Sequence, residues 1–328
     1  MPDDGYAKSV LVTTEWVAEH LDDHGVVVAE VDENPDVYDE GHIRGAVKLH
    51  WRDDLQDPVE RDLVSKDVFE RLLGERGIGN DTVVVLYGDK NNWFAAFAYW
   101  YLKIYGHEDV RIVDGGRQKW IDEGRELTTD APSPERMQYH AKERDETIRA
   151  FRDAVGEDIS AGEKALVDVR SPQEFSGEVI SPPGYEQEGA QRAGHIPTAQ
   201  SIPWAQAVRD DGTFKSPQEL RRLYEAKGVT PDKQVTAYCR IGERSAHTWF
   251  VLRELLGYEA VKNYDGSWTE WGTSSTSRSR RARNRAQESR RSSRIRGSNP
   301  KLLLSPRNGG FGRRCPLLVS GIPEDRRT

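Results

Sequence analysis

The stretch QVTAYCRIGERS, Gln234 to Ser245, decides the fold, because an apolar run in it gives way to a loop and then to a helical pattern. Strand, loop and helix in this order are typical of an open parallel sheet, in which ligands gather at the carboxyl ends of the strands. Cys239 lies at that point, with Arg240 and Arg244 close behind it. The thiol of Cys239 is therefore a candidate nucleophile.

The chain repeats this pattern, which indicates two homologous modules. Three pairs of motifs correspond: GHIRGA (41–46) and GHIPTA (194–199), VVVLYGDKNNW (83–93) and QVTAYCRIGERS (234–245), and VDGGRQKW (113–120) and YDGSWTEW (264–271). Three pairs of residues are separated by the same 151 positions: Gly88 and Cys239, Asp114 and Asp265, and Trp120 and Trp271. The first module has a glycine where the second has its cysteine, so it lacks the thiol.

In each half, apolar β-branched runs alternate with helical patterns, which predicts an α/β fold with a parallel sheet and helices on both of its faces. The strands expected in the first half are Val26–Val31, Val83–Tyr87 and Val110–Val113, and the helices are Thr14–Leu21, Asp67–Gly74 and Trp93–Tyr105. The strands expected in the second half are Ala165–Val169, Gln234–Tyr238 and Ala260–Asn263. SPQEL predicts a helix start, with Ser216 as N-cap and Glu219 closing a capping box.

These patterns divide the chain into a first domain at 9–126, an exposed linker at 127–146, a second domain at 147–272 and a tail at 273–328. The second half also contains a Gly/Pro/Glu-rich loop at 176–192, which has no match in the first half.

Composition limits the class of protein. At 328 residues the chain is long enough for two domains. No apolar stretch approaches the length of a membrane span, and the start MPDDGYAKSV lacks the features of a signal peptide, so we expect a cytoplasmic location. Cys239 and Cys315 are the only cysteines, which excludes a disulfide framework and a four-cysteine zinc site. No metal and no organic cofactor is expected.

Charge changes abruptly after the last repeated motif. Residues 273–328 hold 15 of the 47 Lys+Arg residues and 3 of the 55 Asp+Glu residues, which leaves a net charge of −20 on residues 1–272. A net charge of this size on residues 1–272 is typical of proteins that work in concentrated salt, because salt screens the repulsion between carboxylates. We therefore expect a halophilic host.

The tail has two interpretations. Its run from Gly272 to Arg296, GTSSTSRSRRARNRAQESRRSSRIR, has the composition of an arginine-serine arm that binds nucleic acid. It is also compatible with a frameshift, because codons can be chosen so that one restored base turns GTSSTSRSRR into the acidic GNLVDVPVEK. We favour the frameshift, which predicts that 273–328 are disordered and that Cys315 has no role.

The loop after Cys239 favours an anion. Its backbone N–H groups, the N-terminus of the next helix and two guanidinium groups would surround the sulfur, and Ser245 would cap that helix. This setting predicts a thiol pKa below its usual value of about 8.5. The loop could hold a phosphate-like oxyanion or a sulfur anion on the cysteine. A buried structural cysteine is the alternative, which the cost of burying two arginines argues against.

These residues resemble those of the two-domain rhodanese family of thiosulfate sulfurtransferases, from about Ser9 to Trp271. The motifs that carry the resemblance are GHIRGA and GHIPTA, DGG and DGSW, and the Cys-led loop CRIGER. The resemblance implies tandem rhodanese-like domains, each with a five-stranded parallel sheet, of which only the second is active. It also implies that Cys239 takes the outer sulfur of thiosulfate as a persulfide and passes it to cyanide or another thiophilic acceptor.

The site predicted on this basis has Cys239 as its catalytic residue. The expected substrate-binding residues are Arg240, Ile241, Gly242, Glu243, Arg244, Ser245 and Arg170. The expected supporting residues are Asp168, His195, Asp265 and Trp268. His195 has a counterpart, His42, in the module without a thiol, which favours a structural role; Asp32 is matched to Asp168. The partners expected are a small sulfur donor and a thiophilic acceptor, and neither a membrane nor nucleic acid.

Two features separate the chain from relatives of the resembled family. Its Cys-x4-Arg loop is one residue shorter than the Cys-x5-Arg loop of cell-cycle-type phosphatases and similar arsenate reductases, and it differs from the Cys-Gly-Ser-Gly loop of mercaptopyruvate sulfurtransferases. Animal rhodaneses place Arg at the position of Glu174 and Lys at that of Ile241, so here Arg240 and Arg244 would have to bind the donor. Use of mercaptopyruvate, a phosphatase-like or arsenate-reductase-like activity and non-catalytic sulfur binding stay open.

Overall fold

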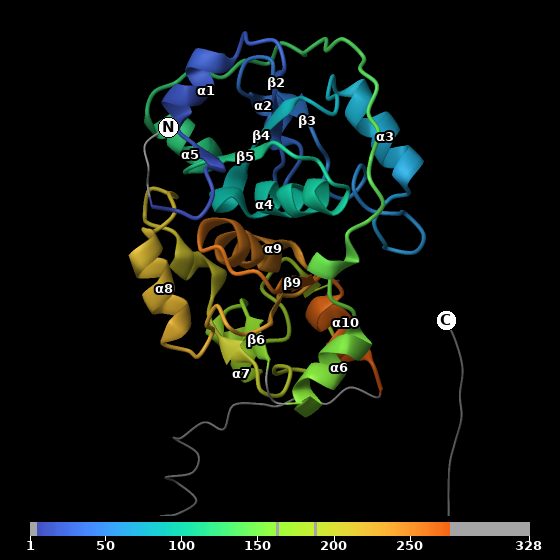
Figure 1. Cartoon of the computed structure of the whole chain (residues 1–328), viewed down its shortest axis with the longest axis vertical. Coiled ribbons are helices and arrows are strands. Elements are labelled where there is room, and N and C mark those ends of the chain that lie inside the picture. Colours follow the sequence, from blue (N-terminus) through green and yellow to red (C-terminus); the bar gives the residue numbers. More distant parts are fainter. Residues whose placement is uncertain (1–4, 162–163, 187–188, 276–328) are drawn as a thin grey trace, which may run out of the picture. The chain divides into compact units, whose positions relative to one another are not determined.

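The computed structural model describes residues 5–161, 164–186 and 189–275, and both modules belong to the same compact unit (Figure 1). A parallel sheet organises each half of the chain. The predictions for residues 276–328, including the disorder of the tail and the absence of a role for Cys315, lie outside the described residues.

The first sheet has five parallel strands in the order β1-β5-β4-β2-β3. They are β1 (Leu11–Val12), β2 (Val26–Glu30), β3 (Val47–Lys48), β4 (Val83–Tyr87) and β5 (Val110–Val113). The central strand β4 reads VVVLY and is buried at four of its five positions, as expected for a strand that is covered on both faces.

The second sheet has four parallel strands in the order β7-β6-β8-β9. They are β6 (Ala165–Asp168), β7 (Gln200–Ser201), β8 (Val235–Tyr238) and β9 (Val261–Tyr264). In the described part of this half, a single parallel bridge between Arg149 and Asn263 lies where the first sheet has β1. The expectation of five strands is therefore confirmed for the first sheet, whereas the second has one bridge in place of its fifth strand.

Helices cover both faces of the sheets. Those of the first half are α1 (Thr14–His20), α2 (Val37–Glu40), α3 (Lys66–Glu75), α4 (Asp89–Ile104) and α5 (Gly116–Asp122). Those of the second half are η1 (Glu146–Ile148), α6 (Arg152–Ala161), α7 (Pro172–Ser176), η3 (Trp204–Ala207), α8 (Pro217–Glu225), α9 (Glu243–Phe250), η4 (Val251–Leu255) and α10 (Ser267–Thr273). The predicted capping box of Ser216 and Glu219 starts α8.

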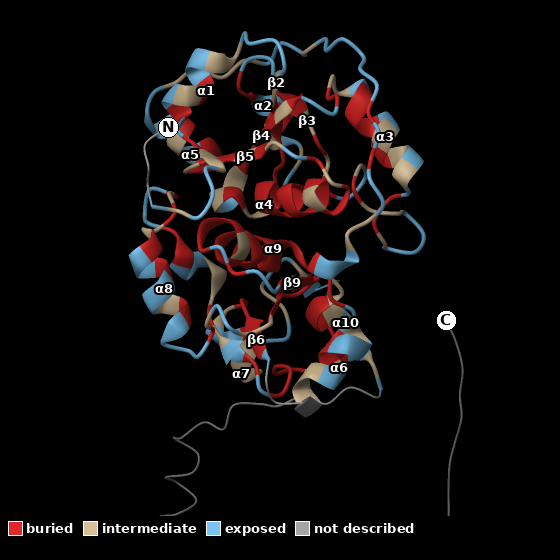
Figure 2. Cartoon of the chain, viewed as in Figure 1, coloured by how far each residue is buried: buried red, intermediate tan, exposed pale blue. Residues whose placement is uncertain are grey.

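The main apolar core extends from one module into the other. It includes Trp100 of α4 and Trp249 and Phe250 of α9, and Figure 2 shows both helices as largely buried. Tyr99 packs edge-on against Phe250, with 4.8 Å between the ring centroids. Because these two residues are 151 positions apart, the equivalent helices of the repeat meet each other. Removing one of the aromatic rings should destabilise the fold by about 3 to 5 kcal/mol.

Most of the segment at 127–146 is exposed, as expected of a linker, but a few of its residues pack against the first module. Tyr139 and Ala141 are buried, and the backbone N–H of Lys142 donates to the carbonyl of Tyr105 at 3.0 Å. The segment packs along the first module because its few apolar side chains find partners there, such as Phe69, which meets the Tyr139 ring edge-on.

Candidate functional site

The loop with the candidate nucleophile joins β8 to α9 at the carboxyl end of the sheet. Gly242 is the N-cap of α9 and has φ of 101°, a left-handed conformation that favours glycine. A Cβ at Gly242 would lie 2.6 Å from the Cα of Asp265, so the close approach of the two loops also requires glycine. The supporting role predicted for Asp265 thus has a steric basis: its backbone packs directly against the loop.

Backbone and side-chain groups fix the position of Cys239. Its N–H donates to Ser267 Oγ at 3.1 Å, and its carbonyl accepts from the N–H of Trp268 at 3.1 Å. The N–H of Gly242 donates to Sγ at 3.1 Å, and Sγ lies 3.4 Å from Glu243 Oε2. The cysteine has no exposed surface. The thiol is therefore held between a backbone donor and a carboxylate.

The prediction of a lowered thiol pKa is wrong for this arrangement. Burial raises the pKa of Cys239 above its usual value, and the carboxylate of Glu243 raises it further. Arg244 and the hydrogen bonds of Ser245 act in the opposite direction but do not outweigh burial. Burial and the neighbouring carboxylate therefore favour the protonated thiol, which has Glu243 as a hydrogen-bond partner.

Arg244 forms a buried ion pair. Its guanidinium donates to both carboxylate oxygens of Glu174 at 3.2 and 3.3 Å, and the ring of Trp93 from the first module lies 5.9 Å away. Burial alone would lower the pKa of Arg244, but Glu174 and the neighbouring loop groups hold it above its usual value. Burial opposes ionisation of Glu174, but Arg244 holds the pKa of that carboxyl below its usual value. Glu174 thus neutralises the arginine.

Arg240 is also close to a carboxylate. Its guanidinium lies 3.8 Å from Glu243 and stacks over the ring of Tyr185 at 4.2 Å. Arg240 and Glu243 are both buried, at 4% and 2% exposure. The two arginines that were expected to bind the donor therefore each have a glutamate beside them.

Ser245 does not cap the helix, which corrects its expected role as N-cap. Since α9 begins at Glu243, Ser245 lies inside the first turn and donates to the carbonyl of Gly242 at 3.1 Å. Its Oγ also lies 2.6 Å from Asn263 Oδ1, and Asn263 Nδ2 donates to the same carbonyl at 3.0 Å. Ser245 thus ties the loop to β9. The carbonyl of Ile241 accepts from Arg61 of the first module.

Arg170 lies in a buried polar cluster behind the loop. It pairs with Asp168 at 2.6 Å, donates to the carbonyl of Gly194 at 2.8 Å and stacks over the ring of Trp268 at 4.7 Å. Asp168 also accepts from the hydroxyl of Tyr238 at 2.7 Å. Asp168 and Trp268 thus hold the Arg170 side chain in place. Because Trp268 also contacts the carbonyl of Cys239, this cluster supports the loop.

The match of Asp32 to Asp168 is wrong. In the first sheet Glu30 pairs with Tyr87, and in the second Asp168 pairs with Tyr238, so the counterpart of Asp168 is Glu30. Asp32 consequently corresponds to Arg170. The error arose because aspartate was aligned with aspartate without knowledge of the strand register.

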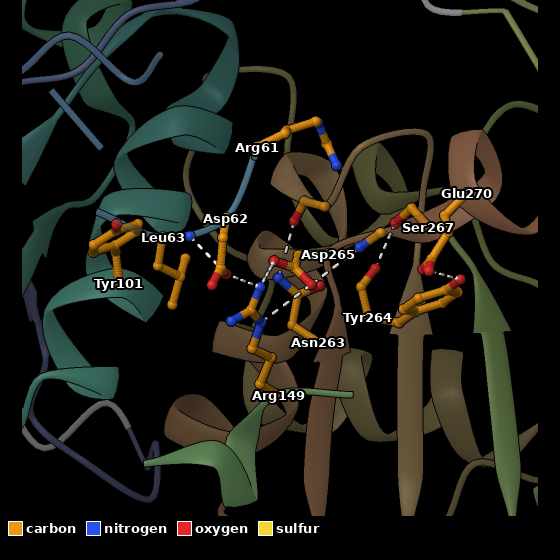
Figure 3. Close-up of polar contacts among 12 residues, drawn as sticks. Arg61, Asp62, Leu63, Tyr101, Arg149, Asn263, Tyr264, Asp265, Ser267 and Glu270 are labelled. Carbon is orange, nitrogen blue, oxygen red and sulfur yellow. Dashed lines mark hydrogen bonds and ion pairs between the residues drawn. The ribbon is translucent and has the colours of Figure 1, made fainter. Parts of the chain in front are cut away.

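The two remaining predicted residues have structural partners. His195 Nδ1 lies 2.8 Å from the carbonyl of Phe175, and its ring stacks on that of Phe175 at 3.7 Å. Asp265 pairs with Arg149 at 3.0 Å, and Arg149 pairs in turn with Asp62 of the first module at 2.6 Å (Figure 3). The contacts of His195 agree with the structural role expected of it.

Residues of the first module also lie beside the loop, and the sequence indicated almost none of them. Arg61 donates to Ile241, and Trp93 faces Arg244. Glu33 is close enough for Arg240 and Glu243 to influence its pKa, which burial raises. Only Trp93 could have been suspected, since it is the counterpart of Arg244 in the repeat.

The described residues also bear on other classes of site. No group of three or more His, Cys, Asp or Glu side chains in them could hold a metal ion. No helix in the same part of the chain is long and apolar enough to cross a membrane.

Comparisons with known proteins agree with this architecture. The family model described as "Rhodanese-like domain" matches residues 13–123 and 152–274. "Sulfur carrier protein TtuD" of Thermus thermophilus is 60% identical over 82% of this chain and 95% of its own length. A "Putative thiosulfate sulfurtransferase" of Saccharopolyspora erythraea is 58% identical over 81% and 94%, and one of Haloferax volcanii is 53% identical over 83% and 96%.

Solved structures of the ergothioneine biosynthesis enzyme EanB are also similar. Wild-type EanB superposes with a TM-score of 0.73 at 26% identity, covering 84% of this chain and 70% of EanB. A further structure of EanB, with the same TM-score, is described as a cysteine persulfide in a tetrahedral intermediate state with ergothioneine. Since the family model matches both modules and the relatives align over most of their length, the chain belongs to the rhodanese family of sulfurtransferases, with two rhodanese-like domains.

Proposed function

We propose that the second module moves sulfane sulfur from thiosulfate to cyanide or another thiophilic acceptor through a persulfide on Cys239. The observation that carries the proposal is the position of the thiol, at the carboxyl end of β8 with the N–H of Gly242 at 3.1 Å from Sγ. The name shared by the Saccharopolyspora and Haloferax relatives supports thiosulfate as the donor.

The first step forms one S–S bond and breaks another. The proton of the Cys239 thiol passes to Glu243, whose Oε2 is 3.4 Å from Sγ. Sγ attacks the outer sulfur of thiosulfate, and the electron pair of the broken S–S bond leaves on sulfite. The N–H of Gly242 stabilises the negative charge that develops at Sγ.

The second step regenerates the thiol. Cyanide attacks the terminal sulfur of the persulfide and forms thiocyanate, and the electron pair of the S–S bond returns to Sγ. The proton on Glu243 then returns to the sulfur. No oxidant or reductant is needed, because the sulfane sulfur keeps its oxidation state.

A carrier role is the second candidate, supported by the name of the Thermus relative. In that role the persulfide would be passed to a thiophilic group on another protein. Mercaptopyruvate as donor and hydrolysis of a phosphate ester are further alternatives, which the loop length and sequence CRIGER disfavour.

Mass spectrometry of the intact protein tests the proposal. After incubation with thiosulfate, the parent and a Cys315→Ser variant should gain the mass of one sulfur atom, and a Cys239→Ala variant should not. Cyanide should remove the added mass and release thiocyanate. If the mass increased with mercaptopyruvate but not with thiosulfate, mercaptopyruvate would replace thiosulfate as the proposed donor. No gain with either, together with cleavage of an artificial phosphate ester, would overturn the proposal.

We further propose that the first module has no sulfur-transfer chemistry of its own, that the domains are 9–126 and 147–272, and that the protein works in the cytoplasm of a halophilic host. The glycine at position 88 and the net charge of −20 on residues 1–272 support these proposals. Unfolding of the protein at low salt and its refolding at about 2 M KCl would support the halophilic host.

A further inference from the structure

Arg61 brings a cation from the first module to the loop of the second. It lies on the segment between Gln56 and Leu63, which are joined by an antiparallel bridge. Its guanidinium donates to the carbonyl of Ile241 at 2.9 Å. The backbone of Asp265 packs against the same loop at Gly242.

The backbone of Arg61 is held in an unusual conformation. Its φ is 52°, in the left-handed region that few residues other than glycine adopt. The N–H of Arg61 donates to the carbonyl of Asp57 at 3.2 Å, which closes the turn. The next residue, Asp62, is anchored by Arg149 at 2.6 Å. A turn fixed at both ends directs the side chain toward the second module.

The loop itself has little positive charge to offer an anionic donor. Arg244 is neutralised by Glu174 at 3.2 Å, and Arg240 has Glu243 at 3.8 Å. Two arginines and two glutamates balance, so the side chains of the loop and its partner Glu174 add no net positive charge. If the second module alone supplied the charged groups at the site, a dianion such as thiosulfate would therefore meet no net positive charge there.

Arg61 differs from both arginines of the loop. Within the described ranges 5–161, 164–186 and 189–275, no carboxylate lies within ion-pair distance of its guanidinium, and the residue is exposed. Its hydrogen bond to the loop goes to the carbonyl of Ile241 and uses one of its five N–H groups.

We propose that Arg61 of the first module is the specificity-determining cation that attracts the anionic sulfur donor to Cys239. This inference rests on the proposed function for the identity of the donor, but the position of Arg61 beside the loop does not. The module without a thiol would thus contribute to the reaction by supplying the charge that the loop lacks. The ligand class is a small divalent oxyanion with a terminal sulfur.

A purely positioning role is the competing explanation, because the hydrogen bond to Ile241 also holds the loop. The two roles differ in their dependence on the charge of the reagent. Loss of a positioning contact should slow every reaction of Cys239, whereas loss of an attracting charge should slow anionic reagents only.

Alkylation of Cys239 separates these roles without any sulfur transfer. Iodoacetate and iodoacetamide react with the thiol by the same displacement of iodide, but only iodoacetate is an anion. Their rates should be compared in the parent, Arg61→Ala, Arg61→Lys and a matched control, Arg71→Ala. The control removes an exposed arginine of α3 in the same module.

In Arg61→Ala, we expect the rate with iodoacetate to fall about tenfold at low salt and the rate with iodoacetamide to stay within twofold of the parent. The KM for thiosulfate should rise about tenfold, with kcat nearly unchanged. Arg61→Lys should recover most of both effects, and Arg71→Ala should behave as the parent.

An equal fall with both alkylating reagents would reduce Arg61 to a positioning residue, and unchanged rates together with an unchanged KM would overturn the inference. If the parent forms no persulfide from thiosulfate, the proposed function fails. The ratio of the two alkylation rates would still decide whether Arg61 attracts anions to Cys239.

Discussion

The two modules share a buried tyrosine and carboxylate at equivalent positions. Tyr87 donates its hydroxyl proton to Glu30 in the first module, and Tyr238 donates to Asp168 in the second. Each hydroxyl also accepts from the backbone N–H of the isoleucine in the GHI motif, at 2.9 Å in the first module and 3.1 Å in the second. The repeat thus kept the polar support of the turn in both modules, whether or not a thiol follows.

The modules differ in where the cation for this carboxylate comes from. In the second, Arg170 lies two residues after Asp168 and pairs with it at 2.6 Å. In the first, that position is Asp32, and the cation is Arg117, at 3.2 Å from Glu30. Arg117 is the counterpart of Trp268, the residue on which Arg170 stacks. Each carboxyl group thus has an arginine beside it, although the arginine comes from a different element in each module.

The loops show why only one module can hold a thiol. Gly88 takes the place of Cys239, and a Cβ there would lie 2.0 Å from the carbonyl oxygen of Val31. The first module has therefore lost the space for a cysteine as well as the cysteine itself. Side chains of the first module, among them Arg61 and Trp93, instead contact residues of the second module at the loop.

The largest effect should follow removal of the cation in the second module. Arg170→Ala leaves Asp168 buried at 0% exposure without its ion-pair partner, and the free energy of unfolding should fall by about 3 to 5 kcal/mol. Urea unfolding at pH 7 measures this. Arg221→Ala, on the exposed face of α8, is the control and should change stability by less than about 0.5 kcal/mol. A fall of similar size in both variants would contradict a special role for the buried pair.

A second comparison places alanine at the first position of each loop. Gly88→Ala should lower the free energy of unfolding by about 3 kcal/mol, because the new methyl group collides with backbone that cannot easily move. Cys239→Ala keeps a Cβ that is already accommodated and should cost about 1 kcal/mol while abolishing persulfide formation. Denaturant titration of both variants gives the two values. Equal stabilities would mean that the first loop can adjust to a side chain.

Sequence reasoning identified what is local. The expected strands agree with β2, β4, β5, β6, β8 and β9 to within a residue or so at each end, since apolar runs bounded by loops determine them. The same reasoning put Cys239 at the end of β8. The N-terminal boundary of α9 was missed because Gly242, in its left-handed conformation, starts the helix before Ser245.

Features that depend on tertiary contact could not be predicted. The raised pKa of Cys239 follows mainly from its burial, and a single sequence does not reveal how deeply a loop cysteine is buried. Arg61 carries no motif, because its significance comes only from a contact with Ile241, 180 positions away. Glu174 departs from the pattern of the resembled family, but its pairing with Arg244 depends on the fold.

The first module should lose stability as pH rises. Burial, followed by the repulsion of Asp32, raises the pKa of Glu30 to about 9, from 4.5. A carboxyl whose pKa is higher in the folded than in the unfolded state stabilises the fold. This contribution to the free energy of unfolding is complete below the pKa of the unfolded state and is lost as the pH rises toward the folded pKa of about 9. Between pH 6 and 9 the slope is at most about 1.4 kcal/mol per pH unit.

Urea unfolding at pH 6, 7.5 and 9 checks this prediction. Glu30→Gln should flatten the dependence on pH, because the amide cannot ionise, whereas the exposed control Glu15→Gln should leave the slope as in the parent. A Glu30→Gln variant with the parental slope would assign the alkaline loss to another group.

The second module should show the smaller and opposite dependence on pH. His247 of α9 takes the place of Ala96, its counterpart 151 positions earlier, and lies fully buried between Phe214 and Trp204. Neither of its ring nitrogens has a hydrogen-bond partner in the described residues. Burial lowers the pKa of His247 to about 3, from 6.5. The unfolded chain therefore binds a proton that the folded chain excludes, and stability that is present above pH 6.5 is lost as pH falls.

His247→Leu removes both the titration and the unpartnered imidazole. We expect a gain of about 1 kcal/mol in the free energy of unfolding at pH 7, because an apolar side chain of similar size leaves no polar atom unsatisfied. The acid loss of stability between pH 6.5 and 5 should also diminish in urea titrations. Persulfide formation should be unchanged, since His247 contacts apolar rings rather than the loop. A destabilised variant would instead mean that the imidazole stacking on Phe214 outweighs the cost of its buried nitrogens.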